Sequence, residues 1–174
     1  MAGKVWRISA RSFFQSSPEG AEALVEVVSD RVQRYAPAAE RLVDLYAGVG
    51  LFAGTIGANR HVVAVERSRS SIADARINLA DLDVRLRDMA VQDWRPEPAD
   101  VVIADPARRG LTSEGVDIVD RTGAALCVLV TCDVGALGRD TRLLLEAGFD
   151  HVDSAVIDLF PHTDAVEVIT TFAR

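Results

Sequence analysis

The feature that most constrains the fold is an apolar run that breaks into a glycine turn and then resumes, within residues 41–52. The run from Leu42 to Leu45 gives way to Gly48-Val49-Gly50, and the segment from Leu51 to Ile56 is compatible with a helix. Glycine is required at such a turn when a ligand lies close against the backbone, because a side chain would hold the ligand away. We therefore expect a strand, a tight turn and a helix start whose free amides complete a nucleotide-type pocket.

Glycine pairs also occur in ordinary turns, so the next strand decides how this motif is interpreted. The run from His61 to Val65 ends at Glu66, which puts a carboxylate at the carboxyl end of the second strand. In α/β nucleotide-binding folds, an acid at this point holds a ribose diol through hydrogen bonds. Ala53 stands where the dinucleotide fingerprint has its third glycine, a permitted variant, so the motif alone leaves both NAD and S-adenosylmethionine (SAM) open.

The remaining apolar runs alternate with helical patterns, as they do around a parallel sheet. Further strands are expected at 5–9, 84–87, 101–104, 125–131, 152–159 and 165–172. Helices are expected at 18–35, 70–82, 116–121 and 134–147, the first of them capped by Ser17 and ended by Pro37. The short connection 160–164 suits an antiparallel hairpin. This order predicts an α/β chain with the class I SAM-dependent methyltransferase (Rossmann-like) fold, a seven-stranded, mostly parallel sheet with an antiparallel last strand.

Polar side chains stand where several of these strands end. Asp105 precedes Pro106, which stops the fourth strand and presents the acid at the same rim as the glycine turn. Asp88 ends the third strand, either as a ligand of an adenine amino group or as an exposed loop acid. Cys132 ends the fifth strand, and a cysteine at such a place is most often a small core residue. We assign Cys127, within the same strand, to the core.

Composition limits the possible partners. At 174 residues the chain is long enough for one domain with a full core, and its 49% hydrophobic and 26% charged residues are typical of globular proteins. The formal charge of -7 argues against gripping nucleic acid by bulk electrostatics, so any RNA contact must be local or supplied elsewhere. Two cysteines without metal-ligand spacing, and no long apolar run, favour a cytoplasmic protein with no membrane contact.

Six separated motifs then follow one another along the chain. They are Ser12-Phe13-Phe14-Gln15, Asp44-Leu45-Tyr46-Ala47-Gly48-Val49-Gly50, Val65-Glu66, Asp105-Pro106-Ala107-Arg108, Thr131-Cys132-Asp133, and Phe160-Pro161-His162-Thr163 leading to Val166-Glu167. In this order they resemble the catalytic domain of the RNA uracil-carbon-5 methyltransferases, the family that makes 5-methyluridine in transfer and ribosomal RNA. The resemblance extends from Ser12 to Phe172.

The resemblance implies a set of site residues and a covalent mechanism. The residues that it puts around SAM are Gln15, Tyr46, Gly48, Gly50, Leu51, Glu66 and Asp88. Asp105 would lie between the cofactor and the target base, Cys132 would be the nucleophile, and Glu167 the base. Carbon 5 of uracil is a poor nucleophile until a thiolate adds at carbon 6, and a carboxylate must afterwards remove the carbon 5 proton. A carboxylate inside the apolar strand around Glu167 is otherwise costly, and no metal or iron-sulfur cluster is implied for this chain.

The chain also departs from the family pattern. The four departures are Ser16, Ala107, Val134 and Ala165. The N-terminal OB-like RNA-binding domain and the cysteine cluster of many members are missing. We therefore expect residues 1–174 to form a single SAM-dependent domain, with 1–40 as a strand-and-helix lead-in, cut from a longer protein and binding tRNA or rRNA weakly.

Other interpretations of the sequence stay open. The surface arginines 108, 109, 139 and 142 either approach RNA phosphates or are simply solvated, and His162 is most simply a loop histidine. The whole domain could also be a non-catalytic SAM-binding remnant or interaction module of the same fold. A third interpretation keeps the enzyme but changes the acceptor to another pyrimidine or a small molecule.

Overall fold

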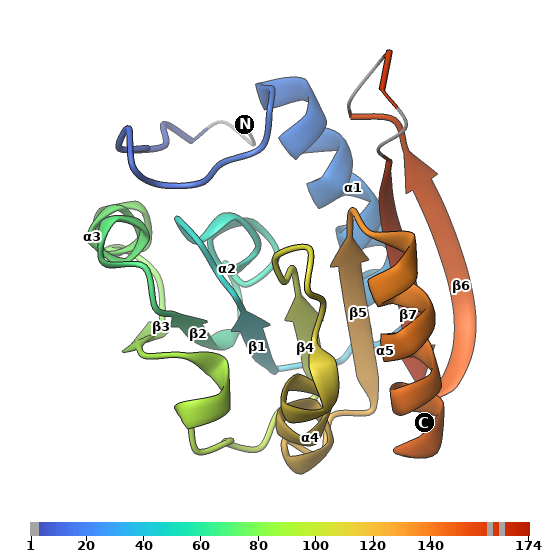
Figure 1. Ribbon diagram of the computed structural model, residues 1–174. Helices are drawn as coiled ribbons and strands as arrows, with labels where there is room; N and C mark the ends of the chain where they lie inside the picture. Colours follow the sequence, from blue (N-terminus) through green and yellow to red (C-terminus); the bar gives the residue numbers. More distant parts are fainter. Residues whose placement is uncertain (1–3, 160–161, 164–165) are drawn as a thin grey trace.

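The computed structural model describes residues 4–159, 162–163 and 166–174, and within them one seven-stranded sheet (Figure 1). The strands are β1 (Arg41–Leu45), β2 (His61–Glu66), β3 (Val84–Asp88), β4 (Val101–Ala104), β5 (Leu126–Thr131), β6 (Asp150–Ile157) and β7 (Glu167–Ala173). Their order across the sheet is β3-β2-β1-β4-β5-β7-β6. The pairs among β1 to β5 are parallel, whereas β7 runs antiparallel to both β5 and β6. The class I methyltransferase architecture expected from the sequence is confirmed.

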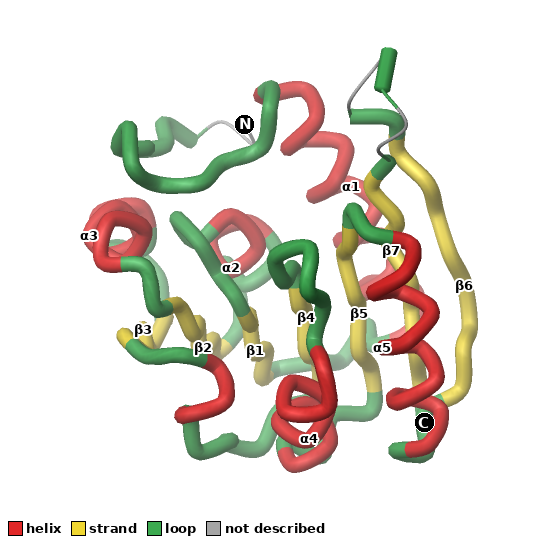
Figure 2. The backbone as a smooth tube through the Cα atoms, viewed as in Figure 1, coloured by secondary structure: helices red, strands yellow, loops and turns green. Residues whose placement is uncertain are grey.

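Helices cover both faces of the sheet (Figure 2). On one face lie α1 (Pro18–Tyr35), α2 (Leu51–Thr55) and α3 (Arg69–Asn78), and on the other lie the 3-10 helix η1 (Val91–Asp93), α4 (Thr112–Arg121) and α5 (Val134–Glu146). Successive residues of a strand point to opposite faces, so the central strands need apolar side chains throughout. Within the described ranges, no helix combines the length and apolar character that crossing a membrane requires.

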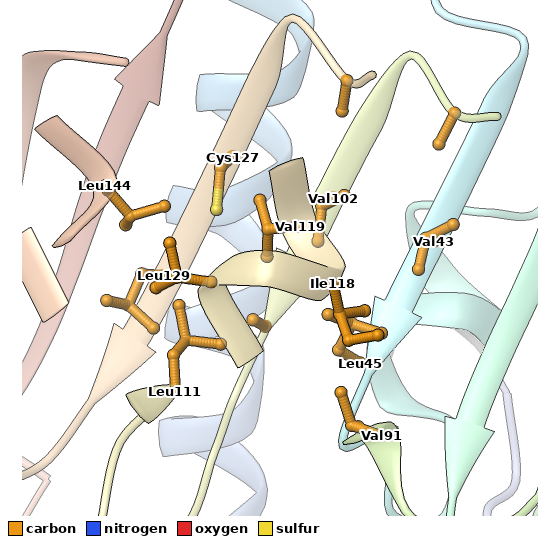
Figure 3. Close-up of a cluster of buried hydrophobic side chains, with 14 of the residues drawn as sticks. Val43, Leu45, Val91, Val102, Leu111, Ile118, Val119, Cys127, Leu129 and Leu144 are labelled. Atoms are coloured by element: carbon orange, nitrogen blue, oxygen red, sulfur yellow. The ribbon is translucent and has the colours of Figure 1, made fainter. Parts of the chain in front are cut away.

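The core on the α4–α5 face is built from alternate residues of the central strands. Cys127 of β5 is buried there beside Leu129, with Val119 of α4 and Leu144 of α5 packed over them (Figure 3). Burial raises the pKa of the Cys127 thiol to about 12. The assignment of Cys127 to the core is confirmed.

Most predicted element boundaries agree with the structure to within a few residues. The helix expected to run to residue 82 instead ends at Asn78, because residues 79–82 close as turns. The helix expected to begin at Val116 begins at Thr112, because the side chain of Asp140 on α5 caps it. Ser17 caps α1 as predicted, by accepting a hydrogen bond from the Gly20 amide.

The prediction of a strand at 5–9 is wrong, because these residues form no strand. The backbone N–H and C=O of Arg7 both pair with the side-chain amide of Asn78, at 2.8 and 3.0 Å. The fully buried Asp74 accepts hydrogen bonds from the Ser9 amide and from the hydroxyls of Ser9 and Ser12, at 2.6 to 2.7 Å. The segment before α1 is therefore held by polar side chains of α3 and not by a sheet edge.

Candidate active site

The glycine turn joins β1 to α2 and is fastened from β2 by Glu66. The amide of Gly48 donates to Glu66 Oε2 at 3.0 Å, and Oε1 of the same carboxylate accepts from the amides of Arg67 and Ser68 at 2.8 and 2.6 Å. Gly48 and Gly50 adopt φ angles of +56° and +91°, which favour glycine. A Cβ added at Gly48 would meet no atom within 4 Å. The turn thus leaves room beside the Glu66 carboxylate for a ligand to approach the backbone.

Asp44, inside β1, is a functional candidate that sequence reasoning did not single out. Its carboxylate is fully buried, with Oδ2 accepting from the Ala53 amide at 2.9 Å and Oδ1 without a hydrogen-bond partner in the described part of the chain. Burial raises its pKa to about 7, against the hydrogen bond from Ala53. Unpaired buried oxygens are rare, so this atom marks a place for a ligand or water donor. The signal in the sequence was an acid within an apolar run.

The sheet register brings a thiol and a carboxylate to the same end of the β5–β7 ladder. The last pair of that ladder is Thr131 with Val168, and the next residues outward are Cys132, in a bend just after β5, and Glu167, the first residue of β7. Cys132 is half-buried, whereas Glu167 is only 6% exposed. Two residues thirty-five positions apart in the sequence therefore meet at one rim of the sheet.

Asp105 joins this pair at the end of β4. Its amide donates to the carbonyl of Leu45 in β1, at 3.3 Å. This bond extends the pairing of β4 with β1 by one residue beyond the end of β4. Burial raises the pKa of Asp105 to about 8, and the charges of Glu167 and Asp44 add to the rise. Burial likewise raises the pKa of the Cys132 thiol, with Glu167 adding to the rise and Arg108 opposing it. These charge effects are those of a cluster of ionisable groups at one rim of the sheet.

The other predicted site residues lie on several different elements. Asp88 ends β3 opposite Glu66 and is exposed, 3.6 Å from Arg76. Leu51 is buried at the start of α2, and Gln15 is half-buried in the segment before α1. Tyr46 differs, because its hydroxyl is directed towards α4, where a Cβ on Gly115 would lie 3.1 Å from it.

The structure does not place the motif around residues 160–165 at the site. His162 is exposed, as a loop histidine would be, while Phe160, Pro161 and Ala165 lie outside the described residues. Over residues 4–159, 162–163 and 166–174, no group of three histidine, cysteine, aspartate or glutamate side chains could hold a metal ion.

Asn78 links the glycine turn to the segment before α1, a role that sequence reasoning missed. Its Nδ2 donates to the carbonyls of both Val49, at 2.9 Å, and Arg7, at 3.0 Å, while its Oδ1 accepts from the Arg7 amide. Asp74 lies one helical turn earlier on the same face of α3 and holds Ser9 and Ser12. The available signal was two polar residues spaced by four on the buried face of a helix.

Replacing Asn78 by alanine should lower the free energy of unfolding by about 2–3 kcal/mol, because the polar groups of Arg7 and Val49 lose their partner. Urea unfolding measures the loss, and trypsin cleavage after Arg7 or Arg11 should become faster. Asn59, in an exposed turn, provides the matched control. Equal unfolding midpoints for Asn78→Ala and Asn59→Ala would contradict the bridging role.

The raised pKa values of Asp44 and Asp105 predict an unusual pH dependence of stability. From the ordinary value of 3.8 to about 7 or 8, the folded chain holds protons that the unfolded chain has released. Stability should therefore fall as pH rises through this window, by about 1.4 kcal/mol per pH unit for each such group. Asp74, whose pKa is lowered to about 2 chiefly by the Ser12 hydroxyl, contributes the opposite slope, and only below its ordinary value.

Urea unfolding at about pH 5.5 and about pH 8 tests this prediction, with greater stability expected at the lower pH. Asp44→Asn should reduce the slope of unfolding free energy against pH by the contribution of about one proton, because the amide cannot titrate. A chain that becomes more stable towards about pH 8, or an unchanged slope in Asp44→Asn, would exclude the protonated carboxyls.

Comparison with known proteins finds related sequences and structures. No family model matches the chain. It is 33% identical to an uncharacterised RNA methyltransferase of Streptomyces coelicolor, over 95% of this chain and 38% of the relative. It is 35% identical to a 23S rRNA (uracil(1939)-C(5))-methyltransferase of Vibrio campbellii, over 78% of this chain and 33% of the relative. The chain thus spans about two fifths or less of the length of these relatives.

A solved structure extends the similarity to three dimensions. The tRNA (uracil-54, C5)-methyltransferase of Pyrococcus abyssi, in complex with S-adenosyl-L-homocysteine, superimposes with a TM-score of 0.87 at 27% identity, covering 99% of this chain and 43% of that one. The N-methyltransferase NodS of Bradyrhizobium japonicum, at 11% identity and a TM-score of 0.73, shares the fold alone. The chain therefore belongs to the RNA uracil-carbon-5 methyltransferase family, whose motifs it carries in order along a class I methyltransferase fold.

Proposed function

We propose that this chain is the SAM-dependent domain of an RNA methyltransferase that methylates carbon 5 of uracil in tRNA or rRNA. The observation that carries the proposal is that Cys132 and Glu167 directly follow the last β5–β7 pair, and that the charges of Glu167 and Asp105 both act on the Cys132 thiol. The fold alone would serve many acceptors. A thiol near a carboxylate is suited to a ring that must first be activated by nucleophilic addition and then lose a proton.

The residues around the glycine turn fit SAM, which when bound supplies a methyl group on a sulfonium centre. Glu66 keeps acceptor capacity for ribose hydroxyls, and the open space at Gly48 admits a ligand to the backbone. The unpaired Oδ1 of Asp44 offers a further polar contact, and Asp88 is exposed at the end of β3. The S-adenosyl-L-homocysteine held by the Pyrococcus abyssi protein supports the same ligand class here.

The chain's own residues then divide the work. The Cys132 thiolate adds to carbon 6 of uracil, forming the S–C6 bond and moving the ring electrons onto an enolate oxygen, so that carbon 5 can accept the methyl group. Asp105, whose pKa of about 8 keeps it largely protonated at neutral pH, donates a hydrogen bond to that oxygen. Glu167 takes the carbon 5 proton, the C5=C6 bond re-forms, and the thiolate leaves.

Transfer of labelled methyl groups from SAM to unmodified tRNA and rRNA tests the proposal, with the modified nucleoside identified after digestion. We expect 5-methyluridine, and no incorporation into RNA that already carries it. SAM binding without transfer would instead favour the non-catalytic module, and a different methylated nucleoside would change the acceptor. Since the chain spans only part of its relatives, the RNA should be supplied well above ordinary working concentrations.

A further inference from the structure

An arginine-lined cleft lies between α4 and α5, outside the site described so far. It has a volume of about 390 Å³ and is lined by Arg109, Thr112, Ser113, Arg139, Arg142 and Leu143. Three guanidinium groups on one cleft are notable in a chain with a formal charge of -7. Leu143 adds an apolar side chain to the lining, and the two hydroxyl residues add neutral donors.

The wall of the cleft is fixed by a buried carboxylate. Asp140 is 1% exposed and accepts from the amides of Leu111 and Thr112, at 2.6 and 3.2 Å. Arg139 donates from Nε to Asp140, at 3.1 Å, and from Nη2 to the carbonyl of Arg109. Both carboxylate oxygens of Asp140 are already occupied by these hydrogen bonds, which also fix α5 against the loop after β4. The arginines therefore project from a preorganised surface.

The remaining acids leave the arginines available to an anion. Arg142 pairs with Glu146 at 2.6 Å, but their side chains are 63% and 58% exposed, and such pairs contribute at most about 1 kcal/mol. Glu114 lies near Arg109 and accepts from the hydroxyls of Thr112 and Ser113. Each guanidinium has five donors in a fork that matches phosphate, and these contacts use only some of them.

The chain connects the cleft to the catalytic rim at two points. Arg109 belongs to the loop that begins with Asp105, and α5 begins at Val134, directly after Cys132 and Asp133. At 1.5 Å per residue, Arg139 and Arg142 lie about 8 and about 12 Å along the helix from its start. We propose that this cleft binds backbone phosphates of the single-stranded RNA that flanks the target uridine, an inference that rests on the proposed function.

Charge reversal at Arg142, with a matched control on α4, tests the cleft. Arg121 is 53% exposed and pairs with Asp117 at 3.1 Å with the same i,i+4 spacing, but it does not line the cleft. Arg142→Glu and Arg121→Glu change the net charge equally, so a difference between them reports position and not bulk charge. The probe is a fluorescent single-stranded RNA containing one uridine, followed by anisotropy from about 50 mM salt upwards.

We expect Arg142→Glu to weaken RNA binding at least tenfold, and to reduce the slope of log affinity against log salt by about 0.7 for each phosphate that the variant no longer neutralises. Arg121→Glu should stay within about twofold of the wild type. Equal losses in the two variants, or no RNA binding by the wild type at low salt, would overturn the inference.

Kinetics separates this result from the proposed function. Arg142→Glu should raise the KM for RNA while leaving kcat and the affinity for S-adenosyl-L-homocysteine unchanged. Methyl transfer with the same KM in Arg142→Glu and Arg121→Glu would refute the cleft and leave the function standing. RNA binding that depends on Arg142, without any methyl transfer, would support the cleft and contradict the proposed function.

Discussion

Replacing Cys132 by alanine is expected to reduce methyl transfer to RNA at least about a thousandfold, because carbon 5 of uracil is then never activated. The same variant should form no covalent complex with RNA that contains 5-fluorouridine. Fluorine at carbon 5 blocks the final proton abstraction, so the wild type should remain attached through Cys132 and migrate as a protein–RNA adduct on a denaturing gel. Since the pKa of the Cys132 thiol is raised, adduct formation should accelerate as pH rises above neutrality.

Cys127 provides the control for this experiment, since it lies in the same strand but points into the core on the α4–α5 face. Cys127→Ala is expected to lose some stability through the small cavity that it leaves, and to keep both transfer and adduct formation. Transfer at similar rates by Cys132→Ala and the wild type would remove the covalent mechanism, whatever the RNA. An adduct that survives in Cys132→Ala would point to a different nucleophile.

Replacing Glu167 by glutamine is expected to arrest the reaction one step later. The thiol can still add and the methyl group can still be transferred, but the carbon 5 proton has no acceptor, so multiple turnover should fall by about 10²- to 10⁴-fold. An adduct with ordinary uridine RNA should then accumulate, whereas the wild type releases it. The glutamine also removes a buried negative charge, so the pKa of Cys132 should fall and addition should proceed at lower pH.

Rapid-quench kinetics with labelled SAM measures this arrest as a single round of transfer without turnover. Glu26→Gln, at an exposed position on α1, is the matched control and should behave as the wild type. Normal turnover by Glu167→Gln would assign proton removal to another base. Loss of even the first round of transfer would give Glu167 a role in addition itself.

The central part of the fold could be predicted because its signals are local. The apolar run of β4 ends at Asp105-Pro106, β1 ends just before the glycine turn, and β2 ends at Glu66, as the sequence indicates. The segment before α1 could not be predicted, because its partners Asp74 and Asn78 are 65 to 71 residues away. A Val-Trp-Arg-Ile sequence favours a strand, and only distant side chains direct it elsewhere.

The residues of the candidate site could be predicted from the sequence, but the register of the strands that carry them could not. Motif order identified Cys132 and Glu167, and the short connection between the last two strands predicted an antiparallel pair. Whether the two residues would both directly follow the last pair depends on the register of the β5–β7 ladder, which a shift of one residue would have changed. The motif does not indicate where the Tyr46 hydroxyl points, which is towards Gly115 on α4.

The cap that Asp140 provides to α4 spans 29 residues of chain. The first turn of α4 is therefore completed only when α5 has docked, although α4 comes earlier in the sequence. The two helices should open and close as one cooperative unit, with amide protons of Leu111 and Thr112 exchanging at the rate of α5 and not at that of an isolated helix end. During synthesis, the start of α4 can become rigid only after α5 has been made and has docked.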